Sequence, residues 1–95
     1  MDEAAMAVCS DSVPRRRLDS RTRNFGGQLL VGGRRSALQL DATAGFVLRR
    51  IDGRRTVHEI AELVAAEYGV DMETATGDVV TLVDQLLDGE IVTLA

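Results

Sequence analysis

Residues 36–51 read SALQLDATAGFVLRRI, and the hydrophobic period changes within this stretch. Before Asp41, Leu38 and Leu40 alternate with small or polar residues, which is the period of two that a strand shows. After Asp41, apolar residues recur three and four positions apart, as in an amphipathic helix. Asp41 is a typical N-cap, because its carboxylate can accept a hydrogen bond from an amide of the first helical turn. The stretch therefore predicts a strand that passes directly into a helix.

Upstream of this junction, the sequence predicts a β-hairpin. Residues 28–31 (QLLV) form a short strand with three apolar residues between two glycine pairs, and residues 36–40 follow the second pair as the next strand. The Arg-rich residues 15–23 add at best an edge strand. We therefore expect two or three antiparallel strands in a domain of residues 15–95. Residues 1–14 lack periodicity, and we interpret them as a flexible N-terminal tail.

Downstream of the junction, the sequence predicts two further helices. Residues 56–59 read TVHE, the spacing of a capping box, and the helix that they open ends near Gly69. Asp71 caps a third helix that ends near Gly89. Residues 91–94 could add a short closing strand. The order of strands and then three helices predicts an α+β, winged helix-turn-helix-like fold.

The charges are divided along the chain. All 11 residues of the Lys and Arg class are arginines, and all lie within residues 1–55. Residues 56–95 contain aspartates and glutamates but no lysine or arginine, and the net charge of the chain is −4. In a helix-turn-helix protein that binds DNA, the second and third helices approach the phosphates. An acidic surface there would be repelled by DNA. A DNA-binding regulator is therefore a less favoured alternative, and we expect no nucleic acid as a partner.

Several other classes are disfavoured by what the sequence lacks. It has no signal-peptide pattern and no apolar run long enough to span a membrane. The single cysteine, Cys9, has no metal-ligand spacing around it, and no nucleophile–base pair is recognisable. A chain of 95 residues cannot bury both a core and an enclosed substrate cavity. We expect a cytoplasmic protein that is not an enzyme and holds no metal or cofactor.

Four segments together resemble the PqqD family, named for pyrroloquinoline quinone biosynthesis. The segments are LQLDATA at residues 38–44, IDGRRTVHEIA at residues 51–61, YGV at residues 68–70, and Asp78-Val79 with Leu82, Val83 and Leu86. The resemblance covers roughly residues 27–94. It departs from the family at two places. Glu90-Ile91-Val92 replaces the usual Gly-Leu-Val, and the aromatic that is common in the family's first helix is reduced here to Phe46.

The resemblance implies a function as a recognition element for ribosomally synthesised, modified peptides. In the family, the leader of a precursor peptide adds as an antiparallel strand to the edge of the strand before the first helix, and its side chains enter a groove beside the third helix. The partner would be a modifying enzyme, such as a radical SAM enzyme or a leader peptidase. The serious alternative is an assembly adaptor that binds only the partner enzyme.

The apolar arc of the third predicted helix supports such a groove. It spans roughly 160°, wider than the ~100° that packing on one core requires. The apolar residues beyond the core-facing stripe are Val80 and Leu87, and Val83 belongs to both parts of the arc. An ordinary core or a dimer face would explain the same arc. We therefore predict a peptide-binding site made of Ser36, Ala37, Leu38, Gln39, Leu40, Val80, Val83, Asp84 and Leu87. Arg34, Arg35 and Asp78 are predicted to contact a partner.

Overall fold

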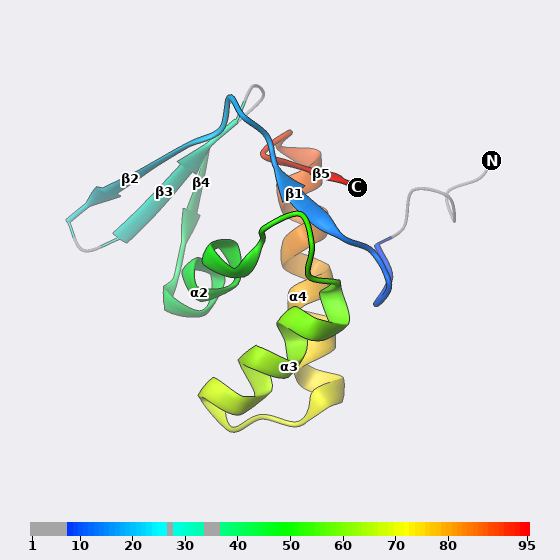
Figure 1. Ribbon diagram of the computed structural model, residues 1–95. Helices are drawn as coiled ribbons and strands as arrows, with labels where there is room; N and C mark the ends of the chain where they lie inside the picture. Colours follow the sequence, from blue (N-terminus) through cyan, green and yellow to red (C-terminus); the bar gives the residue numbers. More distant parts are fainter. Residues whose placement is uncertain (1–7, 27, 34–36) are drawn as a thin grey trace.

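The computed structural model of the protein describes residues 8–26, 28–33 and 37–95 (Figure 1). Its elements are β1 (Pro14–Arg16), β2 (Arg21–Phe25), β3 (Gln28–Gly32), β4 (Ala37–Leu40), α2 (Ala42–Arg50), α3 (Val57–Tyr68), α4 (Met72–Asp88) and β5 (Val92–Leu94). Four strands precede three helices, and a fifth strand follows them. The α+β, winged helix-turn-helix-like class is therefore confirmed.

The main sheet has three antiparallel strands in the order β2-β3-β4. Leu29 pairs with Leu40 and Val31 with Leu38, so these four side chains share the face that covers the helices. Val31 and Leu40 are buried in the core, and Leu29 and Leu38 pack at its margin. The alternation around Leu38 and Leu40 thus predicted the buried face. The Arg-rich residues 15–23, expected to form at best one edge strand, instead contribute to two strands, β1 and the edge strand β2.

The first and last strands form a separate two-stranded ribbon. β1 pairs antiparallel with β5, with Arg15 opposite Thr93. The residues before β1 also lie against the domain, because the Ser12 carbonyl accepts a hydrogen bond from the Val57 amide at 2.8 Å and Pro14 is buried. Residues 8–14 are therefore part of the packed domain rather than the predicted tail, and residues 1–7 lie outside the described residues.

Each helix begins at the side chain that the sequence predicted. The Asp41 carboxylate accepts from the Ala44 amide at 2.8 Å at the start of α2, and the Asp71 carboxylate accepts from the Thr74 amide at 2.7 Å at the start of α4. At α3, Thr56 and Glu59 form the complete capping box. These bonds satisfy amides that have no partner within the helix, so the boundaries are set locally.

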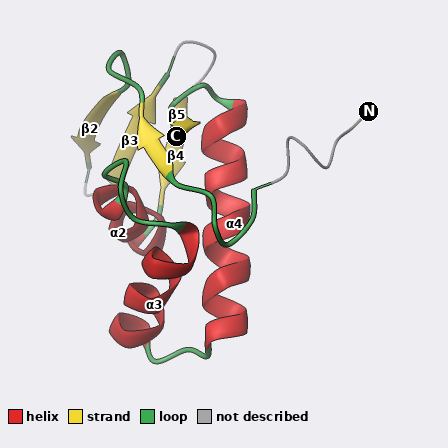
Figure 2. Cartoon of the chain, turned by 45° about the vertical axis from the view of Figure 1, so that its right-hand side comes forward, coloured by secondary structure: helices red, strands yellow, loops and turns green. Residues whose placement is uncertain are grey.

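The core is aliphatic, and its side chains come from the three helices, the main sheet and β5. Figure 2 shows α3 and α4 side by side, with the strands at one end of the pair. α3 packs against α4 along its length, and Ile60, Val79 and Leu86 at their contact are fully buried. α2 packs against both α3 and β4. The described residues contribute no buried charged side chain to this core.

The end of α4 is built with a glutamate in a conformation that glycine prefers. Glu90 has φ of 60°, its amide donates to the Leu87 carbonyl, and the Ile91 amide donates to the Leu86 carbonyl. This pair of bonds is the Schellman motif, in which the left-handed residue is usually glycine. The departure at Glu90 therefore preserves the shape of the helix end while placing a strained residue in it.

Candidate functional site

β4 has one hydrogen-bonding edge without a partner strand. β3 pairs with one side of β4, and within the described part of the chain no strand pairs with the other. In a strand, every second residue turns its amide and carbonyl toward the same edge, so this edge offers main-chain donors and acceptors to another strand. β4 is also the strand of the main sheet nearest α4 (Figure 1).

A hollow of about 380 Å³ lies between α2 and α4, where β4 ends. Its lining residues are Asp41, Thr43, Ala44 and Val47 from the start of α2, and Asp78, Thr81, Leu82 and Gln85 from α4. Ala44, Val47 and Leu82 form an aliphatic floor, and polar side chains surround it. We call this hollow, together with the open edge of β4, the β4–α4 groove.

The sequence places these residues together through helical spacing and one short junction. A single residue, Asp41, joins β4 to α2, so the first turn of α2 stands at the end of the strand. On α4, Asp78, Leu82 and Gln85 are three and four positions apart and therefore lie on one flank. The opposite end of the strand pair is fixed too, because a Cβ at Gly33 would lie 2.6 Å from the Gly89 carbonyl oxygen.

The predicted β-strand residues are where the sequence placed them. Leu38 is half-buried on the helix side of β4, whereas Ala37 and Gln39 are exposed on the outer side. The Gln39 amide group hydrogen-bonds Gln28 across the outer face. Ser36, Arg34 and Arg35 lie outside the described residues, so their predicted contacts stay predictions.

The predicted α4 residues are not brought together with β4. Val83 is fully buried in the core, and Val80 is half-buried against it. Asp84 and Leu87 line a different hollow, on the β5 side of α4, with Glu90 and the β5 strand. Of the α4 residues singled out in the sequence, only Asp78 lies in the β4–α4 groove.

Sequence reasoning missed every residue that lines this hollow except Asp78. Val47, Thr81 and Gln85 were not predicted, because the prediction rested on surplus apolar residues of the third helix. A usable signal was present nonetheless. The predicted closing strand at residues 91–94 needs an apolar helix flank to pack on, and Leu87 lies beside it, which leaves the opposite flank for the groove.

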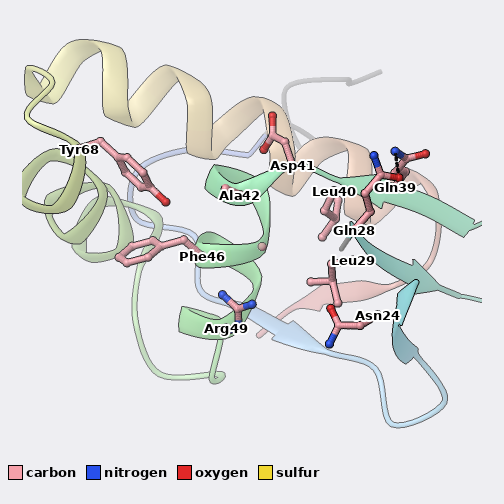
Figure 3. A pocket seen from close by; sticks show the side chains of 11 residues that line it. Asn24, Gln28, Leu29, Gln39, Leu40, Asp41, Ala42, Phe46, Arg49 and Tyr68 are labelled. Atoms are coloured by element: carbon pink, nitrogen blue, oxygen red, sulfur yellow. Dashed lines mark hydrogen bonds between the residues drawn. The ribbon is translucent and has the colours of Figure 1, made fainter. Parts of the chain in front are cut away.

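A second hollow, of about 660 Å³, lies on the other side of α2 (Figure 3). Phe46 and Tyr68 meet edge to face there with ring centroids 5.6 Å apart, and the Arg50 guanidinium lies 3.9 Å from the Phe46 ring centroid. Arg49 also lines this hollow, together with Asn24, Gln28 and Gln39 from the sheet. We call it the aromatic hollow; it lies across α2 from the β4–α4 groove, and Asp41 at the start of α2 lines both hollows.

Among the described residues, no group of three or more His, Cys, Asp or Glu side chains could hold a metal ion. Exposed Cys9 has its pKa lowered, chiefly because the Ser12 hydroxyl hydrogen-bonds its thiol, but no acid–base partner accompanies it. No helix in the described ranges is long and apolar enough to span a bilayer. What the surface offers is an open strand edge beside an aliphatic hollow.

The fold and the groove define a small winged-helix domain with an accessible strand edge. Residues 16–92 match the sequence profile of the family described as coenzyme PQQ synthesis protein D (PqqD). The chain therefore belongs to the PqqD family. A sequence search among curated proteins finds no match.

Solved structures show the same fold. The PqqD truncation of Methylobacterium extorquens PqqCD, described as a functional and stand-alone recognition element for ribosomally synthesised and post-translationally modified peptides, matches with a TM-score of 0.78 and 25% identity over 92% of this chain and 95% of that one. Lasso peptide synthetase B1, solved with its leader peptide, matches at 0.72 with 20% identity over 85% and 98% of the two chains. TbiB1, solved with the TbiA(beta) leader peptide, matches at 0.70 with 18% identity over 82% and 93%.

Proposed function

We propose that this protein binds the leader segment of a ribosomally synthesised precursor peptide and presents it to a partner modifying enzyme. The observation that carries the proposal is the open edge of β4 beside the groove. Membership of the PqqD family and the leader complexes of two proteins with this fold support it. The protein acts in the cytoplasm, contributes no catalytic group of its own, and serves a radical SAM enzyme or a leader peptidase.

The leader binds as an additional antiparallel strand on β4. Its main chain hydrogen-bonds the free amides and carbonyls of Ala37–Leu40, which gives affinity without demanding a particular sequence. Its side chains then alternate between the outer face and the helix face of the extended sheet. Those on the helix face enter the groove, so the groove determines which leaders are accepted.

The groove floor supplies the apolar contact. Val47 and Leu82 are almost fully buried, and half-buried Ala44 leaves a shallow space between them. An aliphatic leader side chain buried there is worth about 1.5–3 kcal/mol before the cost of ordering the peptide is subtracted. We assign the α4 contribution to the flank with Asp78 and Leu82, in place of Val80, Asp84 and Leu87.

The test is binding in the absence of any enzyme. Peptides are selected from a displayed random library on the immobilised protein, and hydrogen exchange is then followed with one selected peptide in excess. We expect slowed exchange at Ala37–Leu40 and unchanged exchange in β5. Peptides that bind without protecting β4, or a failure to select any, would overturn strand addition and leave the adaptor that binds only its enzyme.

A further inference from the structure

The rim of the β4–α4 groove is negatively charged, whereas its floor is aliphatic and uncharged. Asp41 and Asp78 stand on opposite sides of it, one on each helix, and no lysine or arginine is among the lining residues. The remaining rim residues, Thr43, Thr81 and Gln85, are neutral. A guest strand in this groove therefore meets the Asp78 carboxylate with no cation among the lining residues, whereas Asp41, at the junction of β4 and α2, also lines the aromatic hollow, to which Arg49 contributes.

The nearest arginines along the chain turn to the other side of α2. Arg49 lines the aromatic hollow, and Arg50 lies over the Phe46 ring. From Thr56 to the end of the sequence there is no lysine or arginine. α3 and α4 thus carry no lysine or arginine, and Arg49 of α2 lines the aromatic hollow rather than the groove.

Both carboxylates are available to a ligand. Asp78 is exposed and makes no hydrogen bond or ion pair with any residue that the structure describes. Asp41 uses one oxygen to accept from the Ala44 amide, and its second oxygen has no partner within the described ranges. Because carboxylates only accept hydrogen bonds when ionised, a donor with positive charge fits this rim best.

We propose that the groove selects leader segments in which an aliphatic residue and a lysine or arginine lie two positions apart. The inference rests on the proposed function and specifies its substrate. Residues two apart in a guest strand face the same side and are separated by roughly 6.6 Å, twice the rise per residue. The aliphatic side chain occupies the floor at Val47 and Leu82, while the cation reaches Asp78 or Asp41 at the rim.

The experiment repeats the library selection on three proteins. The wild type is compared with Asp78→Arg and with the matched control Asp84→Arg, which makes the same change on the other flank of the same helix. Both positions are exposed, so both variants should fold, and circular dichroism checks that they do. We expect basic residues two positions from an aliphatic residue in peptides selected on the wild type and on Asp84→Arg, but not on Asp78→Arg.

A synthetic peptide from the selection then gives the size of the effect. Replacing its basic residue by glutamate should weaken binding about 10-fold at low salt, and less at high salt, because exposed pairs are screened. On Asp78→Arg the order of the two peptides should reverse. Selected peptides that protect β4 but show no basic preference would refute the charge selection and leave leader binding intact, whereas peptides that never protect β4 would refute both.

Discussion

α4 has two flanks, and each lies beside a strand at the edge of a sheet. On one flank, Asp78 and Leu82 face α2 and the end of β4 across a hollow. On the other, Asp84 and Leu87 lie against β5, which follows the helix through the turn at Glu90. Apolar residues are more numerous on the β5 flank, yet there the chain itself supplies the covering strand. An excess of apolar residues on a helix therefore indicates a contact, but not whether the contact is internal.

The comparison predicts that main-chain bonding operates on the β4 flank alone. Two versions of a selected peptide are made, each with its backbone amides N-methylated at every second residue. Each version lacks the N–H donors along one edge of the guest strand. The version that blocks the edge facing β4 should bind roughly 10- to 100-fold more weakly, because about two hydrogen bonds are lost. Fluorescence anisotropy measures both versions. Equal affinities would mean that the peptide does not bind as a strand.

The β5 flank should matter for stability and not for peptide affinity. Leu87 is half-buried against the core, so Leu87→Ala should lower the free energy of unfolding by about 2 kcal/mol. Urea denaturation measures this loss, and calorimetry should find peptide affinity within about twofold of wild type. Thr81→Ala changes a residue on the exposed rim of the groove. It should lower peptide affinity and leave the free energy of unfolding nearly unchanged. A peptide affinity that falls with Leu87→Ala and not with Thr81→Ala would restore the flank predicted from sequence.

The turn that leads from α4 into β5 offers a smaller, stabilising change. Glu90→Gly removes a side chain from a residue with φ of 60°. The gain should be about 0.5–1 kcal/mol, because relief of left-handed strain exceeds the entropy that glycine adds to the unfolded chain. Thermal denaturation measures this gain in stability. Because the two Schellman hydrogen bonds are made by the backbone and are kept in the variant, peptide binding at the groove should be unaffected. Destabilisation would mean that Glu90 makes a contact worth more than its strain.

The start of α4 is shared by both flanks and gives the smallest effect. Two hydrogen bonds from Thr74 hold the pKa of Asp71 below its ordinary value of 3.8. The larger effect comes from the Thr74 backbone amide and the smaller from its side chain. Because the pKa is lowered on folding, the stabilisation is fully present above 3.8 and is lost as the pH falls through the lowered value. Asp71→Asn keeps the cap at neutral pH, so urea midpoints should match wild type near pH 7 and show a weaker decline in acid. An unchanged acid profile would mean that the Asp71 charge does not contribute.

The local part of this structure could be predicted from sequence. The change of period at Asp41, the capping box at Thr56 and the N-cap at Asp71 each set an element boundary through neighbouring residues only. The same holds for the exposed edge strand, because the alternation of Leu38 and Leu40 identifies a strand that is buried on one face. These features depend on steric and hydrogen-bonding preferences within a few residues.

The rest depends on contacts between distant segments. Nothing near Pro14 indicates that it pairs opposite Leu94, and this pairing determines which flank of α4 is covered. Helical periodicity gives the angle of each apolar residue around the axis, but not the element that lies at that angle. Leu87 was therefore predicted as a groove residue, although it lines the hollow beside β5.

The close approach at Gly33 has a consequence for how fast a peptide binds. Gly33 at the end of β3 lies close to the Gly89 carbonyl, and Asp41 alone joins β4 to α2 at the other end of the strand pair. We therefore expect the spacing between β4 and α4 to be the same in the free protein as in the complex. Association then needs no preceding opening step, so the observed rate should rise linearly with peptide concentration and show no plateau.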